Sequence, residues 1–315
     1  MTQKLIFIAG PTGIGKTSLS IGLAKAIGAQ IISMDSMQIY RGMDIGTAKA
    51  GPLEQDGVVH HLLDVADPGD RFTAEDYQQE AYRAIHVIHE AGSVPLFVGG
   101  TGLYMDAVLH DFKFGGLNIH EDLRKKLQAD YEKEGGDALL EKLAEVDPVS
   151  AKPLFPGDRK KIIRALEIYY ATGRPMSQEK KETEFSDRWD PLIFILEKDR
   201  QALYQAINER VEGMIEAGLI EENIRLRRAG WPRKSQAASA IGYQEVGWYL
   251  RGLVTKSEMV RLIQQFSRNY AKRQVTWFKR YQDAYRFSLD EGVDREAVLG
   301  EMIEVSKEFL KEERK

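Results

Sequence analysis

The stretch Gly10-Pro11-Thr12-Gly13-Ile14-Gly15-Lys16-Thr17 decides the fold prediction for this chain of 315 residues. It matches the pattern G-x-x-x-x-G-K-[ST] at every fixed position, and it lies between an apolar run at 5–9 and a helical pattern at 16–27. Glycines let backbone N–H groups turn toward an anion, and the start of a helix adds partial positive charge. Lys16 supplies a full positive charge, and the Thr17 hydroxyl can bind a magnesium ion held on the phosphates. The stretch therefore predicts a binding site for a phosphate chain.

Two other interpretations of these glycines explain less. A glycine-rich turn without chemical function is disfavoured, because the strand before it and the helix after it are the context that the phosphate-binding motif requires. A dehydrogenase glycine loop needs a spacing that this stretch misses by one residue, and it would give Lys16 and Thr17 no role. A phosphoryl transferase normally adds an Asp that holds magnesium after a second apolar strand. Asp35 is the first candidate for that Asp and Asp64 the second, and the phosphate chain could also serve as a leaving group.

The first hundred residues alternate between strand and helix patterns. Short apolar runs at 31–34 and 94–98 predict buried strands like the one at 5–9, and Thr73 with Asp76 forms a capping pair that begins a helix ending near Ala91. This alternation favours a parallel sheet with helices on both faces, which binds ligands at the carboxyl ends of its strands. Farther along the chain, we expect a strand at 192–196, helices at about 201–229, 236–251 and 256–281, and a mixed-charge helical tail exposed to solvent at 301–315.

Between residues 117 and 184 the chain shows only helical patterns separated by polar turns such as Gly135-Gly136. We therefore predict an α/β fold with a P-loop-type parallel sheet flanked by helices. Its core would comprise residues 1–113 and 187–315, and an all-helical insertion would occupy residues 114–186.

Composition excludes several functional classes. The chain has no cysteine, which rules out disulfides and thiolate metal sites and agrees with a cytoplasmic protein. Its longest apolar runs are far shorter than the ~20 residues that span a bilayer, so we expect no membrane partner. The formal net charge of −4 excludes a uniformly basic nucleic-acid binder and leaves room for a locally basic face. No feature indicates an obligate protein partner.

Four further polar segments follow or neighbour the predicted strands, and each alone could be a structural turn. In chain order they read DSMQIYR at 35–41, MDIGTAK at 43–49, HHLLD at 60–64 and GGTGLY at 99–104. Together with the loop at 10–17, they resemble the bacterial tRNA dimethylallyltransferase (tRNA isopentenyltransferase) family. The resemblance covers roughly residues 5–281 and continues through four later segments: 158–167, TGRPMS at 172–177, AIGYQE at 240–245 and YAKRQVTWF at 270–278.

Departures from the family pattern are small. Gly13-Ile14 stands where the family often has Ala-Ser, and Gln244 where Lys is common. Lys152 and Lys160-Lys161 replace the more frequent Arg or Gln. None of these changes alters the fixed positions of the phosphate loop or Asp35.

The resemblance implies transfer of a dimethylallyl group from dimethylallyl diphosphate to the exocyclic amine of the adenosine directly 3′ of a tRNA anticodon. It also implies Mg²⁺ as cofactor and pyrophosphate as product. Because an adenine amine is a weak nucleophile, we expect Asp35 to help remove its proton. Lys16, magnesium on Thr17 and the loop N–H groups would stabilise the departing diphosphate. By resemblance, Thr101 lies near the target nucleotide. The predicted diphosphate-binding residues are Gly10, Pro11, Thr12, Gly13, Ile14, Gly15, Lys16, Thr17 and Arg210.

Three basic clusters are candidates for an RNA surface. Six basic and no acidic residues lie between 260 and 282, and Arg261, Arg268, Lys272 and Lys279 would share one helix face. We call these four the basic row; a solvated helix face would explain them as well. The opposite face carries an aromatic and apolar row that we expect in the core, formed by Met259, Ile263, Phe266, Tyr270, Trp277 and Tyr281.

The second cluster lies in the insertion at 159–164, a region that the resemblance places against tRNA. The third contains Arg225, Arg227, Arg228, Arg233 and Lys234. An enzyme acting on a stacked base has to extrude it, and we expect the 35–38 loop to take part, with Gln38 bonding to the base and Met37 packing beside it. The predicted tRNA-binding residues are Asp35, Ser36, Met37, Gln38, Thr101, Lys160, Lys161, Ile162, Ile163 and Arg164.

Three other functions remain open from the sequence. A P-loop small-molecule kinase with a helical lid would phosphorylate an acceptor with ATP. A prenyltransferase acting on free adenine nucleotides would share the phosphate loop and the carboxylate, although the basic clusters favour a macromolecular substrate. An RNA-binding module without enzymatic activity would leave the intact phosphate loop unexplained.

Overall fold

The computed structural model describes residues 2–112, 121–178, 185–232 and 234–312. The chain divides into two compact units. Unit 1 comprises residues 1–111 and 185–315, and unit 2 comprises residues 112–184. The predicted insertion of 114–186 begins and ends two residues later than unit 2.

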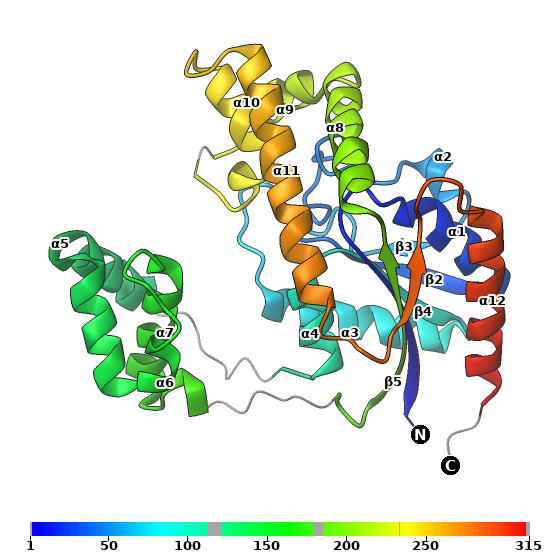
Figure 1. Cartoon of the computed structure of the whole chain (residues 1–315), viewed down its shortest axis with the longest axis horizontal. Helices are drawn as coiled ribbons and strands as arrows, with labels where there is room; N and C mark the ends of the chain where they lie inside the picture. The colour runs from blue at the N-terminus through cyan, green and yellow to red at the C-terminus, as the bar shows by residue number, and fades with distance from the viewer. Residues whose placement is uncertain (1, 113–120, 179–184, 233, 313–315) are drawn as a thin grey trace. The chain divides into compact units, whose positions relative to one another are not determined.

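Unit 1 is built on a six-stranded sheet with the strand order β3-β2-β4-β1-β5-β6, in which every neighbouring pair is parallel (Figure 1). The arrangement confirms the predicted α/β fold. Four of its strands lie where the apolar runs predicted them, whereas β3 and β6 have only two and four residues and no apolar run to reveal them. The strands are β1 (Gln3–Ala9), β2 (Ala29–Met34), β3 (His60–His61), β4 (Val94–Gly99), β5 (Trp189–Glu197) and β6 (Tyr285–Ser288).

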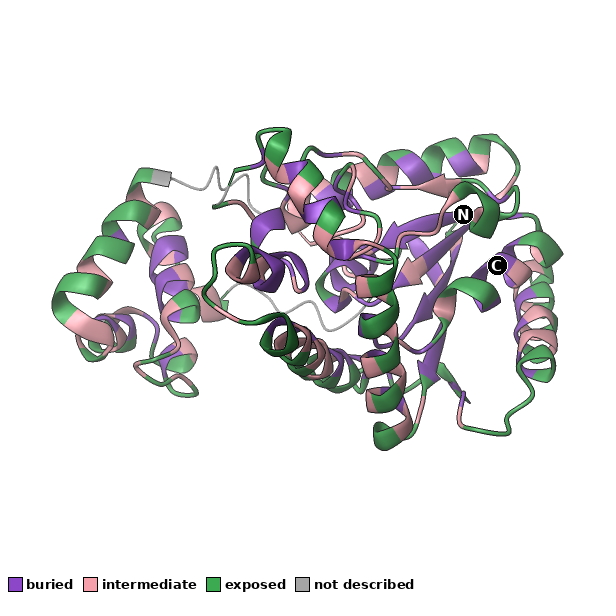
Figure 2. Cartoon of the chain, turned by 90° about the horizontal axis from the view of Figure 1, so that it is seen from above, coloured by how far each residue is buried: buried purple, intermediate pink, exposed green. Residues whose placement is uncertain are grey.

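Both faces of the sheet are covered, and its central strands are buried (Figure 2). Along β1, Leu5 and Phe7 enter one apolar core and Ile6 and Ile8 the other, as alternation in a strand requires. Phe7 stacks on Phe97 of β4 at 4.7 Å between ring centroids. The first core is covered by α3 (Ala74–Glu90) and α4 (Gly102–Leu109), and the second by α1 (Lys16–Ile27) and α12 (Arg295–Lys311).

The predicted helix signals at α1 and α3 are confirmed. Gly28 caps the end of α1 with a left-handed φ of 66°, a conformation that favours glycine. Thr73 accepts a hydrogen bond from the Asp76 N–H at 3.1 Å, and the Asp76 carboxylate accepts from the Thr73 N–H at 2.8 Å. This reciprocal pair is the predicted capping box.

The C-terminal half of unit 1 differs from the prediction in two of its helices. The helix expected at 201–229 is two helices, α8 (Arg200–Glu216) and α9 (Leu219–Arg228), because Gly218 has a φ of 99°. The helix expected at 236–251 is a 3₁₀ turn and the shorter α10 (Tyr243–Tyr249), followed by α11 (Lys256–Phe278).

The helix predicted at 301–315 is confirmed as far as Lys311, where α12 ends, but one face of it is buried rather than solvated. Within α12, Val298 and Met302 are buried in the second apolar core, four residues apart on one face of the helix. In the sequence, the many charged residues on the exposed face of α12 hide the apolar spacing of its buried face. Residues 313–315 of the predicted tail lie outside the described part of the chain.

The described residues of unit 2 form helices around their own apolar core, which contains Leu139, Leu143 and Leu166. The predicted turn at Gly135-Gly136 is present: α5 (Glu121–Val146) changes direction at Gly135, where φ is 88°. Two more helices follow, α6 (Pro148–Ala151) and α7 (Arg159–Thr172). The predicted helical positions at 117–120 and 179–184 lie outside the described residues. Unit 1 contains one further short helix, α2 (Pro52–Gln55), and none of the described helices could cross a membrane.

Candidate active site

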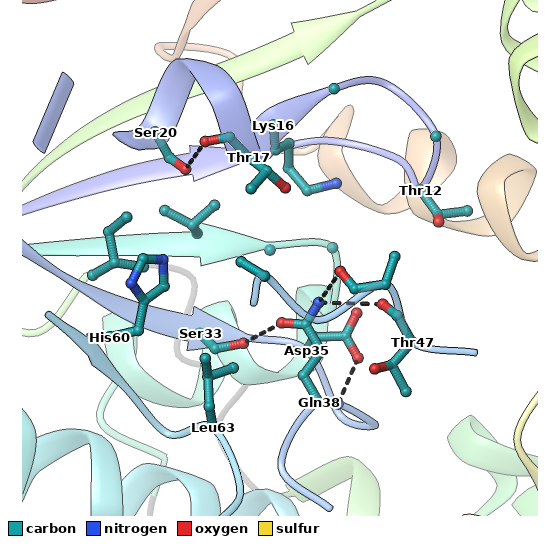
Figure 3. Close-up of a pocket in the computed structure, with 18 of the residues that line it drawn as sticks. Thr12, Lys16, Thr17, Ser20, Ser33, Asp35, Gln38, Thr47, His60 and Leu63 are labelled. Carbon is teal, nitrogen blue, oxygen red and sulfur yellow. Dashed lines mark hydrogen bonds between the residues drawn. The ribbon is translucent and has the colours of Figure 1, made fainter. Parts of the chain in front are cut away.

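The phosphate loop turns from the end of β1 into α1 and forms one wall of a pocket (Figure 3). Gly13 and Gly15 have φ values of 79° and 93°, which other residues rarely adopt. Between them Ile14 is buried in the second apolar core and anchors the loop. The Lys16 ammonium group donates to the carbonyl oxygens of Gly10 at 2.9 Å and Pro11 at 2.8 Å, so it lies folded along its own loop.

The charge on Lys16 is sensitive to its surroundings. Burial lowers its pKa to about 7, the positive Arg210 contributes to the same shift, and the negative Asp35 opposes it. Without an anion, the site therefore holds Lys16 near the midpoint of its titration at neutral pH. A bound diphosphate would favour the charged form and raise this pKa again.

Asp35 lies across the pocket from Lys16 and Thr17 (Figure 3), directly after β2. One carboxylate oxygen, Oδ1, accepts hydrogen bonds from the backbone N–H groups of Met37 at 2.8 Å and Gln38 at 3.3 Å. The Thr101 hydroxyl accepts from the Ser36 N–H at 3.2 Å. These bonds fix the 35–38 turn and leave the second carboxylate oxygen of Asp35, Oδ2, available to the pocket.

A second pocket adjoins the first and has a more apolar lining. Asp35, Thr12, Thr47 and Arg210 line both pockets, so Asp35 lies at their junction. Arg210 donates to the Thr47 carbonyl at 3.4 Å, and burial lowers its pKa while Asp35 opposes the shift. The side chains that give the second pocket its apolar character are Met37, Ile207, Val211, Met214, Ile241 and Ile263.

The structure thus brings together residues from separate predicted motifs. Lys16, Thr17, Asp35 and Arg210 line one pocket, and Thr101 contacts the turn that carries Asp35. Ser36 and Met37 line the second pocket. Pro11 and Ile14 shape the loop from behind, where both are buried.

Gln38 has a structural role in this geometry. Its side-chain oxygen accepts from the Ser33 hydroxyl at 3.0 Å, and its amide nitrogen donates to the carbonyls of Thr47 and Ala48, each at 3.3 Å. Gln38 therefore supports the loop that carries Thr47. A contact between its amide hydrogens and a nucleobase would require giving up one of these bonds.

The motif at 43–49 is held by a nearly buried lysine. The side chain of Lys49 is 5% exposed, and its ammonium group lies 2.7 Å from the carboxylates of both Asp44 and Asp64. It also donates to the Tyr40 carbonyl at 2.9 Å. Asp64 is thus engaged by Lys49 and does not line either pocket, which removes it as the second candidate for a magnesium-holding Asp.

Sequence reasoning missed three residues that shape the site. Tyr270, assigned to the core row, lines the apolar pocket; burial and the negative Asp35 raise its pKa to about 12, so its hydroxyl keeps its proton at pH 7. Glu222 is fully buried and accepts hydrogen bonds from three consecutive N–H groups, at 44–46. Gln274 bridges the phosphate loop to the segment after β4. In the sequence, Tyr270, Glu222 and Gln274 look like ordinary helix residues. Only their contacts with residues far away in the chain show that they shape the site.

The basic row on α11 is mostly accessible. Arg261, Lys272 and Lys279 are exposed, whereas Arg268 is half-buried and hydrogen-bonded to Asn208. The opposite row is partly core, as predicted, since Met259, Ile263 and Tyr281 are buried. The other three members, Phe266, Tyr270 and Trp277, are half-buried.

The cluster in unit 2 separates into exposed and buried parts. Lys160 and Lys161 are exposed, and Lys161 pairs with Asp158 at 3.0 Å. The prediction that Ile162 and Ile163 contact tRNA is corrected at this point, because both side chains are buried in the apolar core of unit 2.

Arg164 is held by a buried carboxylate, whereas most described members of the third cluster are exposed. Arg164 lies 3.1 Å from the buried carboxylate of Glu167, which also binds Arg124 at 2.7 Å. In the third cluster, Arg225, Arg228 and Lys234 are exposed, and Arg233 lies outside the described residues.

The donors that face the pocket suit magnesium brought in with a phosphate chain. The Thr17 hydroxyl lines the pocket and offers one oxygen ligand. No group of three or more acidic or histidine side chains that could hold a metal ion occurs among the described residues. Mg²⁺ is commonly held by one or two protein oxygens together with substrate phosphates and water. The residues therefore fit a substrate-bound magnesium ion.

Comparisons with known proteins agree with one another. The family model described as IPP transferase matches residues 38–281. The tRNA dimethylallyltransferase of Shouchella clausii is 46% identical over 292 residues, covering 92% of this chain and 93% of that protein. The Bacillus subtilis tRNA dimethylallyltransferase is 44% identical over 294 residues, covering 93% of each chain.

Solved structures show the same similarity. The full-length tRNA isopentenylpyrophosphate transferase of Bacillus halodurans superimposes with a TM-score of 0.74 at 41% identity, covering 98% of this chain and 97% of that one. A eukaryotic dimethylallyltransferase acting on tRNA gives a TM-score of 0.83 at 29% identity, covering 99% of this chain and 82% of that one.

The titration of Lys16 gives a testable pH dependence. Because an anion binds the protonated lysine, binding takes up a proton at pH values above about 7. We expect the affinity for an alkyl diphosphate to fall as pH rises from 7.5 to 9, by up to about tenfold per pH unit. Isothermal titration calorimetry in buffers of different ionisation enthalpy measures both the affinity and the proton uptake. Lys16→Met should bind more weakly with little pH dependence over this range, and a flat wild-type profile would contradict the assignment.

Proposed function

The chain belongs to the IPP transferase family, and from this premise we propose that it transfers a dimethylallyl group from dimethylallyl diphosphate to tRNA. The acceptor is the exocyclic amine of the adenosine directly 3′ of the anticodon, and pyrophosphate is released. One observation carries the proposal: Asp35 lies at the junction between an anion-binding loop and an adjoining apolar pocket. A carboxylate at such a junction can reach an incoming nucleophile while the leaving group is held on the other side.

The diphosphate is proposed to occupy the polar pocket. Lys16 and Arg210 supply positive charge there, and the loop N–H groups add donors at the start of α1. When diphosphate departs, its negative charge increases, and groups already fixed in position stabilise that charge without further rearrangement. Burial strengthens this interaction because less water screens it.

The adjoining pocket suits the apolar parts of both substrates. Met37, Val211 and Ile263 offer contacts to a five-carbon chain and to the faces of an adenine ring. Tyr270 adds a neutral hydroxyl that can donate a hydrogen bond within the same pocket. The extruded base would therefore exchange its stacking in RNA for contacts with these side chains.

The chemical step is a substitution at the first carbon of the dimethylallyl group. The adenine nitrogen forms a bond to that carbon, and the bond from the carbon to the diphosphate oxygen breaks. The proton leaving the nitrogen passes to the free oxygen of Asp35, whose other oxygen keeps the 35–38 turn in place. Thr17 would help to hold a magnesium ion, which when bound would supply further positive charge to the leaving group.

The proposed activity is tested by the identity of the product. We expect labelled dimethylallyl diphosphate with Mg²⁺ to modify one adenosine beside the anticodon of a tRNA, detected by nuclease digestion and mass spectrometry. Parallel reactions contain AMP, or ATP with candidate acceptors. Prenylated AMP without modified tRNA would favour the nucleotide prenyltransferase, and a phosphorylated acceptor would favour the kinase.

The substitution Asp35→Asn isolates the proton transfer. The amide side chain of this variant keeps an oxygen that can accept from the N–H groups of the turn, but it cannot take up a proton. Single-turnover transfer by Asp35→Asn should fall by about 10²–10⁴-fold, with dimethylallyl diphosphate binding nearly unchanged. Asp67→Asn removes a carboxylate that lines neither pocket, and it should retain the wild-type rate. An undiminished rate in Asp35→Asn would end this assignment.

We further propose that Lys160 and Lys161 of unit 2 contact tRNA phosphates. Both are exposed and begin α7, whose opposite face packs into the core of unit 2. Reversing the charge of Arg164 would be a less specific test of tRNA binding. The buried carboxylate of Glu167 would then lie beside a second negative charge, which would destabilise unit 2.

The double variant Lys160→Glu/Lys161→Glu should weaken tRNA binding and reduce the slope of log affinity against log salt by roughly 1.4–1.8, the value for two lost phosphate contacts. The matched control, Lys126→Glu/Lys133→Glu, makes the same charge change at exposed positions on α5 and should keep the wild-type slope. Equal slopes for the two double variants would contradict the placement.

A further inference from the structure

We infer that Gln274 of α11 is a positioning residue that fixes the phosphate loop relative to the segment carrying Thr101. This inference rests on the proposed function. The Gln274 side-chain oxygen accepts from the Thr12 N–H at 2.9 Å, and its nitrogen donates to the Gly100 carbonyl at 2.9 Å. One buried amide thereby joins the loop after β1 to the loop after β4.

The bond to Thr12 restrains a peptide unit that Lys16 also contacts. The carbonyl and N–H of one trans peptide point in opposite directions. In the peptide between Pro11 and Thr12, the carbonyl accepts from Lys16 at 2.8 Å while the N–H donates to Gln274. The orientation of this peptide is therefore set from both ends, and it carries Thr12, which lines both pockets.

The bond to Gly100 depends on an unusually close approach. A Cβ atom at Gly100 would lie 2.1 Å from the Gln274 nitrogen and 3.1 Å from the Gly10 carbonyl oxygen. A Cβ atom at Gly102 would lie 2.1 Å from the ring of Trp277, which follows Gln274 on α11. Glycines at 100 and 102 thus allow α11 to lie directly on the segment that begins α4.

Gln274 is also linked, through Tyr270, to the apolar pocket, which is the part of the site proposed to hold the nucleoside. The side chain of Tyr270, one turn earlier on α11, interacts with both Thr101 and Gln274. Thr101 in turn accepts a hydrogen bond from the turn that holds Asp35. A single helix therefore contacts the phosphate loop, the Thr101 segment and the apolar pocket, while its exposed face carries part of the basic row.

The chemistry of the amide explains why Gln is needed at this position. The main chain offers one N–H donor at Thr12 and one carbonyl acceptor at Gly100, and Gln presents one partner to each, with the Tyr270 hydroxyl as a third neighbour. A carboxylate could accept from Thr12 but would repel the Gly100 carbonyl oxygen. A protonated carboxylic acid could satisfy both groups. Gln274→Glu should therefore be impaired at high pH and recover when the new side chain takes up a proton.

The test compares three variants by equilibrium binding of dimethylallyl diphosphate and by steady-state transfer to tRNA. Gln274→Met keeps the length of the side chain and removes both bonds; we expect at least tenfold weaker diphosphate binding and an unchanged KM for tRNA. The diphosphate affinity of Gln274→Glu relative to wild type should rise at least fivefold between pH 8.5 and pH 6. Gln265→Met changes an exposed glutamine on the same helix and should match the wild type.

The results of these measurements either support or contradict the positioning role of Gln274. Wild-type diphosphate binding in Gln274→Met, or parallel pH profiles for Gln274→Glu and wild type, would overturn it. A rise confined to the KM for tRNA would also overturn it and would make Gln274 an RNA contact. If Gln274→Met does not fold, the pH profile of Gln274→Glu is decisive. Because the binding measurement does not require prenyl transfer, it tests Gln274 even if the wild-type protein fails the product assay.

Discussion

The close approach of neighbouring strand ends in the parallel sheet is the constraint on which this structure depends. β2, β4 and β1 are adjacent, so the segments after them meet at one edge. Contact there is tight: a Cβ atom at Gly99 would lie 2.3 Å from the Met34 carbonyl oxygen. Gly99, the last residue of β4, therefore allows the close approach of β2 and β4 at the edge where the site lies. The close approach of the strand ends allows Asp35 and Lys16 to face one pocket although 18 residues of helix, strand and loop lie between them.

The electrostatics of the pocket favour a highly charged anion. Among the described residues that line the pocket, two cationic side chains, Lys16 and Arg210, face one carboxylate, Asp35. Burial and mutual repulsion make it costly to keep both cations charged, which is why the pKa of Lys16 falls to about 7. An anion relieves this cost. The same imbalance that weakens the positive charge on Lys16 before an anion binds would strengthen binding of the proposed diphosphate and stabilise it as it departs.

Buried charged side chains outside the pocket hold the segment at 44–49 in place. Glu222 accepts from three successive backbone N–H groups and from the Tyr243 hydroxyl at 2.6 Å, and Lys49 joins Asp44 to Asp64. These contacts fix the loop that carries Thr47 between the two pockets. The segment at 43–49 therefore contains both a residue that lines the pockets, Thr47, and a residue that supports them from outside, Lys49. Removing one partner would leave a buried charge without compensation.

Local patterns were enough to predict the strand-loop-helix of the phosphate site, the strands β1, β2, β4 and β5, and the position of Asp35 after β2, because glycine spacing and apolar runs act over a few residues. Contacts between segments far apart in the chain place Gln274 and Tyr270 in the site and Ile162 in a core, and no local pattern predicts these contacts. Such contacts also place α12 over the sheet. A hydrogen bond across 262 residues leaves no local pattern, and helical spacing alone does not tell which face meets the protein.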